Sequence, residues 1–230
     1  MAKRPIFVPL INGKGLVLER YVDFEWYAGF AKSQKQKSIR ALHEMAAREY
    51  GVKSPLEVSS KSETPLGVAL SSFNLKFETQ RGRLLTVEAA FQGSKVFACG
   101  GPYRDIFDMK PMDAKKDERL RNSGFLKNFT FFGVCWELEP KTAFYDWLYI
   151  NALLKNPNLA SQVTDIDGFT DIEFNPEKSI NCQARAAALY CALFHSEKLD
   201  FALSSNENFI SLYRGKVTDP HMPAEVRYLI

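Results

Sequence analysis

Strand-like and helix-like segments follow one another irregularly along the whole chain, and no linker separates them. Apolar runs on either side of an Asn-Gly turn at residues 12–13 predict a hairpin between Arg4 and Asp23. Further strand-like runs lie at 56–58, 66–77, 129–136 and 169–175, the third with Gly133 as a bulge. The 230 residues contain no internal repeat and no low-complexity tract, and this length suits one ordinary core. We therefore expect a single domain over residues 1–230.

Helical periodicity appears in four segments, whose ends carry residues with known positional preferences. The segments are 33–50, 86–98, 143–155 and 176–195. Ser33, Thr86 and Thr142 have hydroxyls that can cap the first three helices, and Pro176 suits the first turn of the fourth. Gly51 suits the left-handed position that follows a helix. A charged segment at 113–121 predicts one more, exposed helix.

Composition and charge exclude several classes of protein. Hydrophobic residues make up 46% and charged residues 25% of the chain, which is typical of a folded globular protein. The formal net charge of +3 suits a protein that meets phosphates, yet it is too small to demand a nucleic acid. No run approaches the roughly 20 apolar residues of a membrane helix, and the first residues are unlike a signal peptide. We expect no membrane association and a cytoplasmic location.

Cysteine and histidine spacing gives no sign of a metal or a cofactor. The four cysteines lie far apart, without a CxxC pair, and the three histidines show neither triad nor metal spacing. Free thiols, no metal and no cofactor are therefore expected. Basic side chains gather at 32–40 and 115–121; a solvated helix face is the simpler interpretation of the first group.

One polar stripe stands out in the segment TVEAAFQGSKVF. On a helix over 86–98, Glu88, Gln92 and Lys95 fall at positions i, i+4 and i+7, beside an apolar stripe. Glu88 and Lys95 are then two turns apart, about 10 Å along the axis, so each must find another partner. A carboxylate, an amide and an amine in a row can grip sugar hydroxyls or supply acid and base. The same residues are also the usual solvated flank of a surface helix, and periodicity alone favours that interpretation.

Three other groups are weaker candidates for ligand contacts. The segment GGPYRD could hold a pyrophosphate through Gly101, Tyr103 and Arg104, although a tight turn explains it equally well. Lys61 in SSKS could contact a phosphate, although a simple loop is the safer interpretation. Trp147 could stack on a base, but its helical spacing with other apolar residues favours packing in the core.

The order of these motifs resembles the NADAR superfamily. Phe73 and Asn74 are similar to that family's Ser-Asn-Phe segment, and Glu88, Gln92 and Lys95 are similar to its Glu-x-x-x-Gln-x-x-Lys helix. The longer context resembles, more particularly, the NADAR antitoxins encoded beside DarT-type toxins, which ADP-ribosylate guanine in DNA. This context comprises VSSKS, AFQGSKVF, GGPYRD, FYDWLYI and FTDIEFNPEKSINCQ, over roughly residues 5–194.

The resemblance implies a fold, an activity and roles for residues. It implies a single compact α+β domain, mainly helical, with a small β-sheet around a ligand cleft. It implies a glycohydrolase that removes ADP-ribose from guanine in DNA, with ADP-ribose as product and a DarT-type toxin as functional partner. By motif position, Lys95 would act on the anomeric carbon of the ribose, and Glu88 would orient or protonate the ribose. Asp171 matches the downstream acidic position, although the Trp-Gly that ends this family motif is absent here.

The sequence is also compatible with two other functions. The first keeps the chemistry but takes a small phosphoribosylated amine as substrate, as some relatives in riboflavin metabolism do. The second is a protein without catalysis, which neutralises the toxin by binding ADP-ribose or the toxin itself. For an enzyme, Lys95 can be a nucleophile that forms a Schiff base only if burial or a neighbouring cation lowers the pKa of its amine. As an ammonium it would instead stabilise charge or hold a phosphate.

Overall fold

A long antiparallel hairpin lies at the centre of the largest sheet. The computed structural model describes residues 1–11, 15–213 and 227–229. Strands β1 (Ala2–Pro9) and β2 (Val17–Phe24) pair over their whole length, which confirms the predicted hairpin; its Asn-Gly turn lies outside the described residues. Strands β9 (Gly168–Thr170), β3 (Pro55–Glu57) and β10 (Arg227–Leu229) extend the sheet to the order β10-β2-β1-β9-β3. Strand β3 runs parallel to β9.

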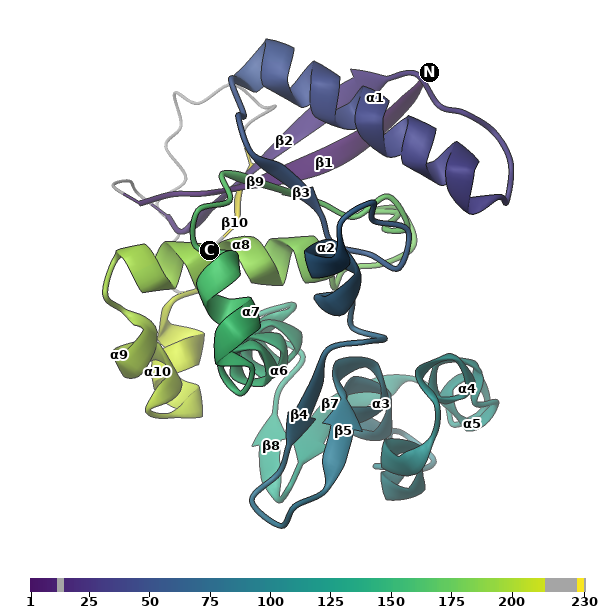
Figure 1. The fold of residues 1–230 in the computed structure, drawn as a ribbon. Coiled ribbons are helices and arrows are strands. Elements are labelled where there is room, and N and C mark those ends of the chain that lie inside the picture. Colours follow the sequence, from purple (N-terminus) through teal and green to yellow (C-terminus); the bar gives the residue numbers. More distant parts are fainter. Residues whose placement is uncertain (12–14, 214–226, 230) are drawn as a thin grey trace.

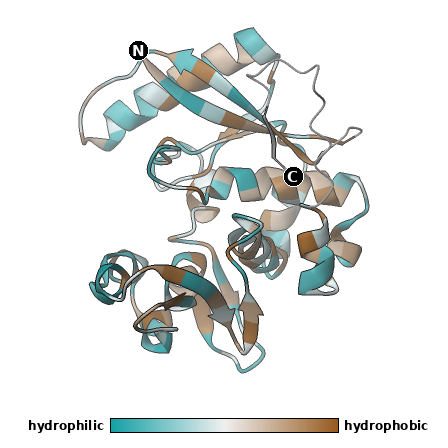
Figure 2. Cartoon of the chain, turned by 180° about the vertical axis from the view of Figure 1, so that it is seen from behind, coloured by the Kyte–Doolittle hydropathy of each residue, from teal (hydrophilic) through white to brown (hydrophobic). Residues whose placement is uncertain are grey.

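Helices cover both faces of this sheet (Figure 1). Helix α1 (Lys32–Tyr50) packs Ile39, Leu42 and Ala46 on one face, and Figure 2 shows hydrophilic and hydrophobic residues mixed along it, as a one-sided helix requires. The predicted Ser33 cap is wrong, because the N-cap is Ala31, whereas Gly51 is left-handed as expected. Helix α8 (Gln183–His195) covers the other face and is buried through most of its length.

The start predicted for that last helix is wrong. Helix α8 begins at Gln183, not at Pro176, because Asn175 turns the chain first. The Asn175 side chain accepts a hydrogen bond from the Glu177 N–H, and its carbonyl accepts from the Lys178 and Ser179 N–H groups. An asparagine that satisfies the backbone in this way favours a turn over a helix.

The strand predicted at 66–77 is also wrong. Residues Pro65–Ala69 form helix α2, whose N-cap Thr64 accepts a hydrogen bond from the Gly67 N–H. A Thr-Pro start is a strong helix signal, and it outweighs the strand-like composition that follows. Only the end of the segment becomes a strand, β4 (Lys76–Glu78), which pairs with β5 (Leu84–Thr86).

The central helix is shorter than predicted. Helix α3 (Val87–Gly93) begins at the expected cap, Thr86, but ends at Ser94, and residues Lys95–Phe97 form strand β6. Strand β6 pairs with β7 (Leu126–Phe131), which pairs with β8 (Val134–Trp136). The single strand expected at 129–136 is therefore a hairpin, with Gly133 in its turn at a φ of 90° rather than in a bulge. Residues Lys95–Phe97 form a strand because they pair with β7, about thirty residues later in the chain. Helical periodicity cannot predict such a distant partner.

The remaining helices surround the small sheets and fill the core. The exposed helix predicted at 113–121 is two helices, because the chain leaves the helical conformation at Asp117. Thr142 lies at the N-cap of α6, as expected, but its hydroxyl donates to the Asp146 carboxylate instead of capping the backbone. The helices are η1 (Arg104–Asp108), α4 (Pro111–Lys116), α5 (Arg119–Asn122), α6 (Ala143–Leu154), α7 (Pro157–Gln162), α9 (Leu199–Leu203) and α10 (Asn206–Ser211).

The result is a single α+β domain in which helices predominate, as the resemblance implied. Within the described residues its strands form three sheets, whereas one small sheet was expected. The larger of its two main hydrophobic cores joins α6, α8 and the small sheets, and the other lies between α1 and the hairpin. No helix in the described part of the chain is long and apolar enough to span a membrane.

Candidate functional site

Helix α3 directs Glu88 and Gln92 into a buried, hydrogen-bonded cluster. Their exposed fractions are 6% and 7%, so neither residue belongs to a solvated flank. One oxygen of Glu88 accepts from the Gln92 side-chain amide at 2.8 Å, and the other accepts from the Ser72 hydroxyl at 3.2 Å. The Glu88 N–H also donates to the Ser72 carbonyl. Burial of a carboxylate is costly, and the two side-chain donors offset part of that cost. Buried polar groups of this kind gather at functional sites, which favours the functional interpretation.

The same cluster contains an unused acceptor. The Gln92 side-chain oxygen is buried and has no hydrogen-bond partner among the described residues. Most buried polar atoms are paired in folded proteins, so an unpaired amide oxygen beside a carboxylate marks a place where a ligand hydroxyl or N–H can bind.

Lys95 reaches this cluster from strand β6 instead of from the helix. Its side chain is half-buried, and its Nζ lies 4.8 Å from the centre of the Phe91 ring. The pKa of Lys95 is lowered to about 8: burial is the main cause, the charge of Glu88 opposes it, and the charge of Lys115 adds a smaller lowering. Lys95 therefore has the burial that a nucleophilic lysine requires. It lies on a strand, however, so the i, i+4, i+7 helical spacing predicted for Glu88, Gln92 and Lys95 is not present.

Phe73 and Asn74 follow Ser72 in the loop that faces Glu88. Phe73 is half-buried, and the Lys115 Nζ from helix α4 lies 5.3 Å from its ring centre. Asn74 is exposed, and its amide donates to the Val68 carbonyl, which closes the turn after α2. Phe73 thus lies beside the charged groups of the site, whereas Asn74 holds the loop.

Gln183 connects this cluster to the predicted acidic residue. Its amide oxygen accepts from the Ser72 N–H at 2.7 Å, and its amide nitrogen donates to the Val58 carbonyl at 2.6 Å. The Gln183 side chain is also hydrogen-bonded to Asp171, which is buried. Burial, followed by the charge of Glu57, raises the pKa of Asp171 well above its usual range. Asp171 therefore belongs to the same hydrogen-bonded network as Glu88.

Glu57 is a residue of this network that sequence reasoning missed. It lies at the end of β3, and its oxygens accept from the Ser59 hydroxyl at 2.6 Å, the Thr170 hydroxyl at 2.7 Å and the Ile172 N–H at 2.9 Å. Burial raises its pKa. A glutamate inside the strand-like run 56–58 was a usable signal, because a charge in a buried strand needs partners. Ser72 and Gln183 were missed too, and no local signal marks them.

His43, on helix α1, adjoins the network. Its Nε2 lies 2.8 Å from the Thr170 hydroxyl oxygen, and burial lowers its pKa to about 4. Because the single Thr170 hydroxyl proton goes to Glu57, the His43 Nε2 must be the donor in this contact.

The GGPYRD segment supports the backbone of Lys95. Gly101 has a φ of +84°, and a Cβ at this position would lie 2.3 Å from the Lys95 carbonyl oxygen, so only glycine fits. The Tyr103 hydroxyl is hydrogen-bonded to the Ser123 hydroxyl. Arg104 is exposed and begins η1. The backbone of this segment therefore packs closely against Lys95 at Gly101. No such contact is seen for the Arg104 guanidinium among the described residues.

Lys61 and Trp147 lie in different surroundings. Lys61 is half-buried, and its N–H donates to the Ser59 hydroxyl, one residue of the Glu57 cluster. Trp147 packs against the rings of Phe131, Trp136 and Phe144, with centres 6.3, 5.1 and 6.4 Å away. Packing in the core, the favoured interpretation of Trp147, is confirmed.

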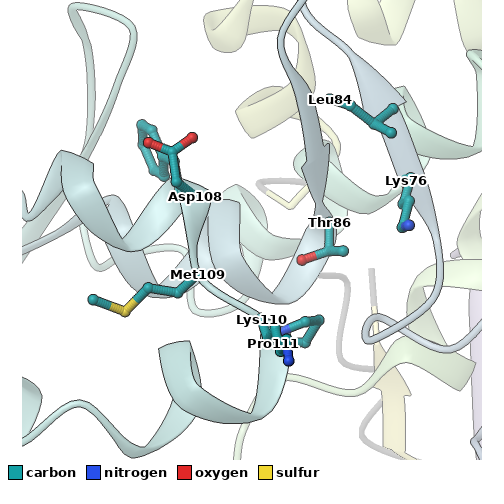
Figure 3. Close-up of a pocket in the computed structure, with 8 residues that line it drawn as sticks. Lys76, Leu84, Thr86, Asp108, Met109, Lys110 and Pro111 are labelled. Carbon is teal, nitrogen blue, oxygen red and sulfur yellow. The ribbon is translucent and has the colours of Figure 1, made fainter.

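One pocket, of about 290 Å³, lies beside helix α3 (Figure 3). Glu88, Lys95 and Asp171 do not line it, although Thr86 caps the helix that carries Glu88. It combines apolar side chains with two amines. The lining residues are Lys76, Leu84, Thr86, Phe107, Asp108, Met109, Lys110 and Pro111. In the described residues, no three histidine, cysteine, aspartate or glutamate side chains could hold a metal ion together.

The fold and the site agree with the class of protein indicated by the motif. A small α+β domain brings a glutamate, a glutamine and a lysine to one buried cluster, in the order found in NADAR proteins. The family model described as DarT1-associated NADAR antitoxin matches residues 2–222, and the chain therefore belongs to this family. No curated protein matches the chain.

Proposed function

We propose that the protein is a glycohydrolase that removes ADP-ribose from guanine bases in DNA. It would so reverse the modification made by the DarT1 toxin with which its family is associated. The observation that carries this proposal is the half-buried Lys95, whose lowered pKa and proximity to the Glu88–Gln92 cluster suit chemistry at a sugar carbon. Chromosomal DNA as substrate would place the protein in the cytoplasm.

Lys95 acts on the anomeric carbon of the ribose. At neutral pH an amine with a pKa of about 8 is partly neutral, so it can add to an open-chain or oxocarbenium-like ribose and form a Schiff base. Water then hydrolyses the Schiff base and releases ADP-ribose. Reduction with borohydride during turnover is expected to trap ADP-ribose on Lys95. Turnover without any trapped adduct would instead assign Lys95 the role of an ammonium that stabilises charge.

Glu88 and Gln92 hold the ribose. The Glu88 carboxylate accepts from a hydroxyl and an amide inside the protein, and a ribose hydroxyl can take the place of the Ser72 donor. The unpaired Gln92 oxygen accepts a second hydroxyl. Asp171, tied to the same cluster through Gln183, is the third catalytic residue of the proposal.

The remaining predicted contacts are proposed with different roles. Phe73 provides an aromatic face beside Lys115 for a base, whereas Tyr103 and Gly101 shape the backbone near Lys95. The contacts of Asn74 and Trp147 described above indicate that these two residues act by supporting the site. Lys61 and Arg104 are proposed as phosphate contacts because neither side chain has an ion pair among the described contacts.

DNA is expected to approach from the side of helix α4. Lys115 and Lys116 are exposed there, and the charge of Lys115 lowers the pKa of Lys95. By contrast, Lys35 of the 32–40 group is paired with Glu173, and Arg119 of the 115–121 group is paired with Asp105 and Asp117. A DNA substrate requires contacts with phosphates, so activity should weaken as the salt concentration rises.

The test is release of free ADP-ribose from guanine-ADP-ribosylated DNA. Wild type is expected to release it, whereas Lys95→Ala and Glu88→Ala should lower kcat/KM at least about 100-fold, the scale of a lost catalytic group. Matched controls are the exposed Lys127→Ala and Glu78→Ala, which lie on β7 and β4 and should leave release near the wild-type rate.

Other outcomes would replace the proposal with a different function. Salt-independent cleavage of a phosphoribosylated amine, with none of modified DNA, would favour the small-molecule substrate. Binding of modified DNA or of ADP-ribose without release would favour neutralisation by sequestration.

A further inference from the structure

Two buried carboxyl groups lie at the ends of adjacent strands, at the edge of the candidate site. Glu57 ends strand β3, and Asp171 directly follows strand β9. The two strands are parallel, with Glu57 opposite Thr170. Both side chains are buried, at 2% and 9% exposure, and the charge of Glu57 raises the pKa of Asp171.

The two carboxyl groups are supported unequally. Glu57 accepts three hydrogen bonds, from two hydroxyls and one backbone N–H. Asp171 accepts from the Glu173 N–H and is hydrogen-bonded to Gln183. Two neighbouring carboxyl groups removed from water cannot both be ionised at little cost, and hydrogen bonds from donors favour the ionised form. The charge therefore resides on Glu57, and the proton resides on Asp171.

We propose that Glu57 is a positioning residue that holds Asp171 in place and keeps it protonated, so that Asp171 donates a proton to the leaving base. Glu57 grips the residues on both sides of Asp171, namely the Thr170 hydroxyl and the Ile172 N–H. Asp171 is in turn joined to the Glu88 cluster through Gln183 and Ser72. This inference rests on the proposed glycohydrolase function and adds a residue and a proton-transfer role to it.

Hydrolysis consumes one water molecule and uses one proton from Asp171. The bond between the ribose anomeric carbon and the base nitrogen breaks, its electron pair passes to the nitrogen, and the nitrogen takes the proton of Asp171. The anomeric carbon, captured by the Lys95 amine, is finally bonded by the oxygen of one water molecule as the amine leaves. One proton of this water returns to the Asp171 carboxylate, which restores the starting state.

Other titratable groups surround the pair. Glu173, in the loop after Asp171, also raises the pKa of Asp171, although its own side chain is exposed and paired with Lys35. Cys182, at the start of α8, and Tyr149, on α6, both have their pKa values raised, chiefly by burial. Their thiol and phenol are therefore neutral near pH 7. His43, on α1, is neutral as well because its pKa is about 4.

The test is the pH dependence of ADP-ribose release by Glu57→Gln. Glutamine keeps the size of Glu57 and can still accept from the Ser59 hydroxyl and the Ile172 N–H. Without the negative charge, the pKa of Asp171 falls, and Asp171 loses its proton at a lower pH. The rate relative to wild type should therefore be close to one near pH 5 and should fall by at least about tenfold at pH 7.5, since each pKa unit changes the protonated fraction tenfold.

Two further variants separate this role from simple structural support. Glu173→Gln removes an exposed carboxylate near Asp171 and should change the rate less than threefold at every pH, because solvent screens it. Thr170→Val removes a donor to Glu57 at constant volume and should reproduce the pH-dependent loss of Glu57→Gln at smaller amplitude. It also keeps the test decisive if Glu57→Gln does not fold.

Each outcome either supports or overturns the inference. A loss in Glu57→Gln and Thr170→Val that grows with pH supports it. A loss that is equal at all pH values, or no loss, overturns it, because either result means that Glu57 does not control the proton of Asp171. Failure of wild type to release ADP-ribose at any pH would instead overturn the proposed function itself.

Discussion

The lowered pKa of Lys95 makes a prediction that can be checked without any substrate. Its pKa of about 8, against 10.5 for an ordinary lysine, makes about 10% of the amine neutral at pH 7, compared with about 0.03% ordinarily, a gain of about 300-fold. Burial is the main cause, and the charge of Lys115 adds to it, whereas the charge of Glu88 opposes it. Lys115→Ala should therefore raise the pKa of Lys95, and Glu88→Gln should lower it.

Competitive acylation measures this directly. The protein is treated with a trace of amine-reactive reagent at a series of pH values, and labelling of the Lys95 peptide is followed by mass spectrometry, with exposed Lys127 as internal reference. The Lys95 titration should have its midpoint near pH 8, and the two variants should move it in opposite directions. A midpoint above pH 10, or no response to either variant, would refute the assignment of a buried, partly neutral amine.

Three further changes test the site and its support. Gly101→Ala should lower the free energy of unfolding by at least about 2 kcal/mol in urea, because the alanine Cβ would meet the Lys95 carbonyl oxygen. Gly133→Ala, also at positive φ but with open space around it, should lower it by only about 1 kcal/mol. Equal losses in the two variants would contradict the contact at Gly101. Asp171→Asn should raise the melting temperature relative to wild type more at pH 8 than at pH 4. This is because a folded-state pKa above the unfolded value means that stability falls as pH rises through it; a gain independent of pH would argue against a protonated Asp171. Arg185→Ala removes the cation of the buried pair with Asp146 and should lower the free energy of unfolding by about 3 kcal/mol. Arg83→Ala, which removes one partner of a surface pair, should lower it by less than about 1 kcal/mol. Similar losses in both variants would show that burial does not set the strength of the pair.

Local patterns predicted the elements whose stability is decided locally. The opening hairpin has a turn between two apolar runs, and α1 has its apolar stripe and the left-handed Gly51. Where a distant partner decides, the patterns failed. Residues Lys95–Phe97 continue the helical periodicity of α3, yet they pair with β7 about thirty residues later. The same pairing places Lys95 on a strand, where the charge of Glu88 still acts on the pKa of its amine.

The residues of the candidate site also fall into a group set by a local motif and a group brought together by the fold. Glu88, Gln92 and Lys95 lie within one short motif, so a family resemblance could identify them. Glu57, Ser72 and Gln183 are brought together by the fold alone; the hydrogen bond between Ser72 and Gln183 joins residues 111 positions apart. No periodicity or spacing connects such residues, because their contact depends on the packing of α8 against the sheet. The network around Asp171 is therefore visible only in three dimensions.

The central claim is catalysis, and counting turnovers tests it most directly. Wild-type protein is mixed with a hundredfold excess of guanine-ADP-ribosylated DNA, and free ADP-ribose is quantified over time. We predict many moles of ADP-ribose released per mole of protein, with unmodified guanine restored in the DNA. Release that never exceeds one mole per mole, or tight binding with no release, would contradict the account.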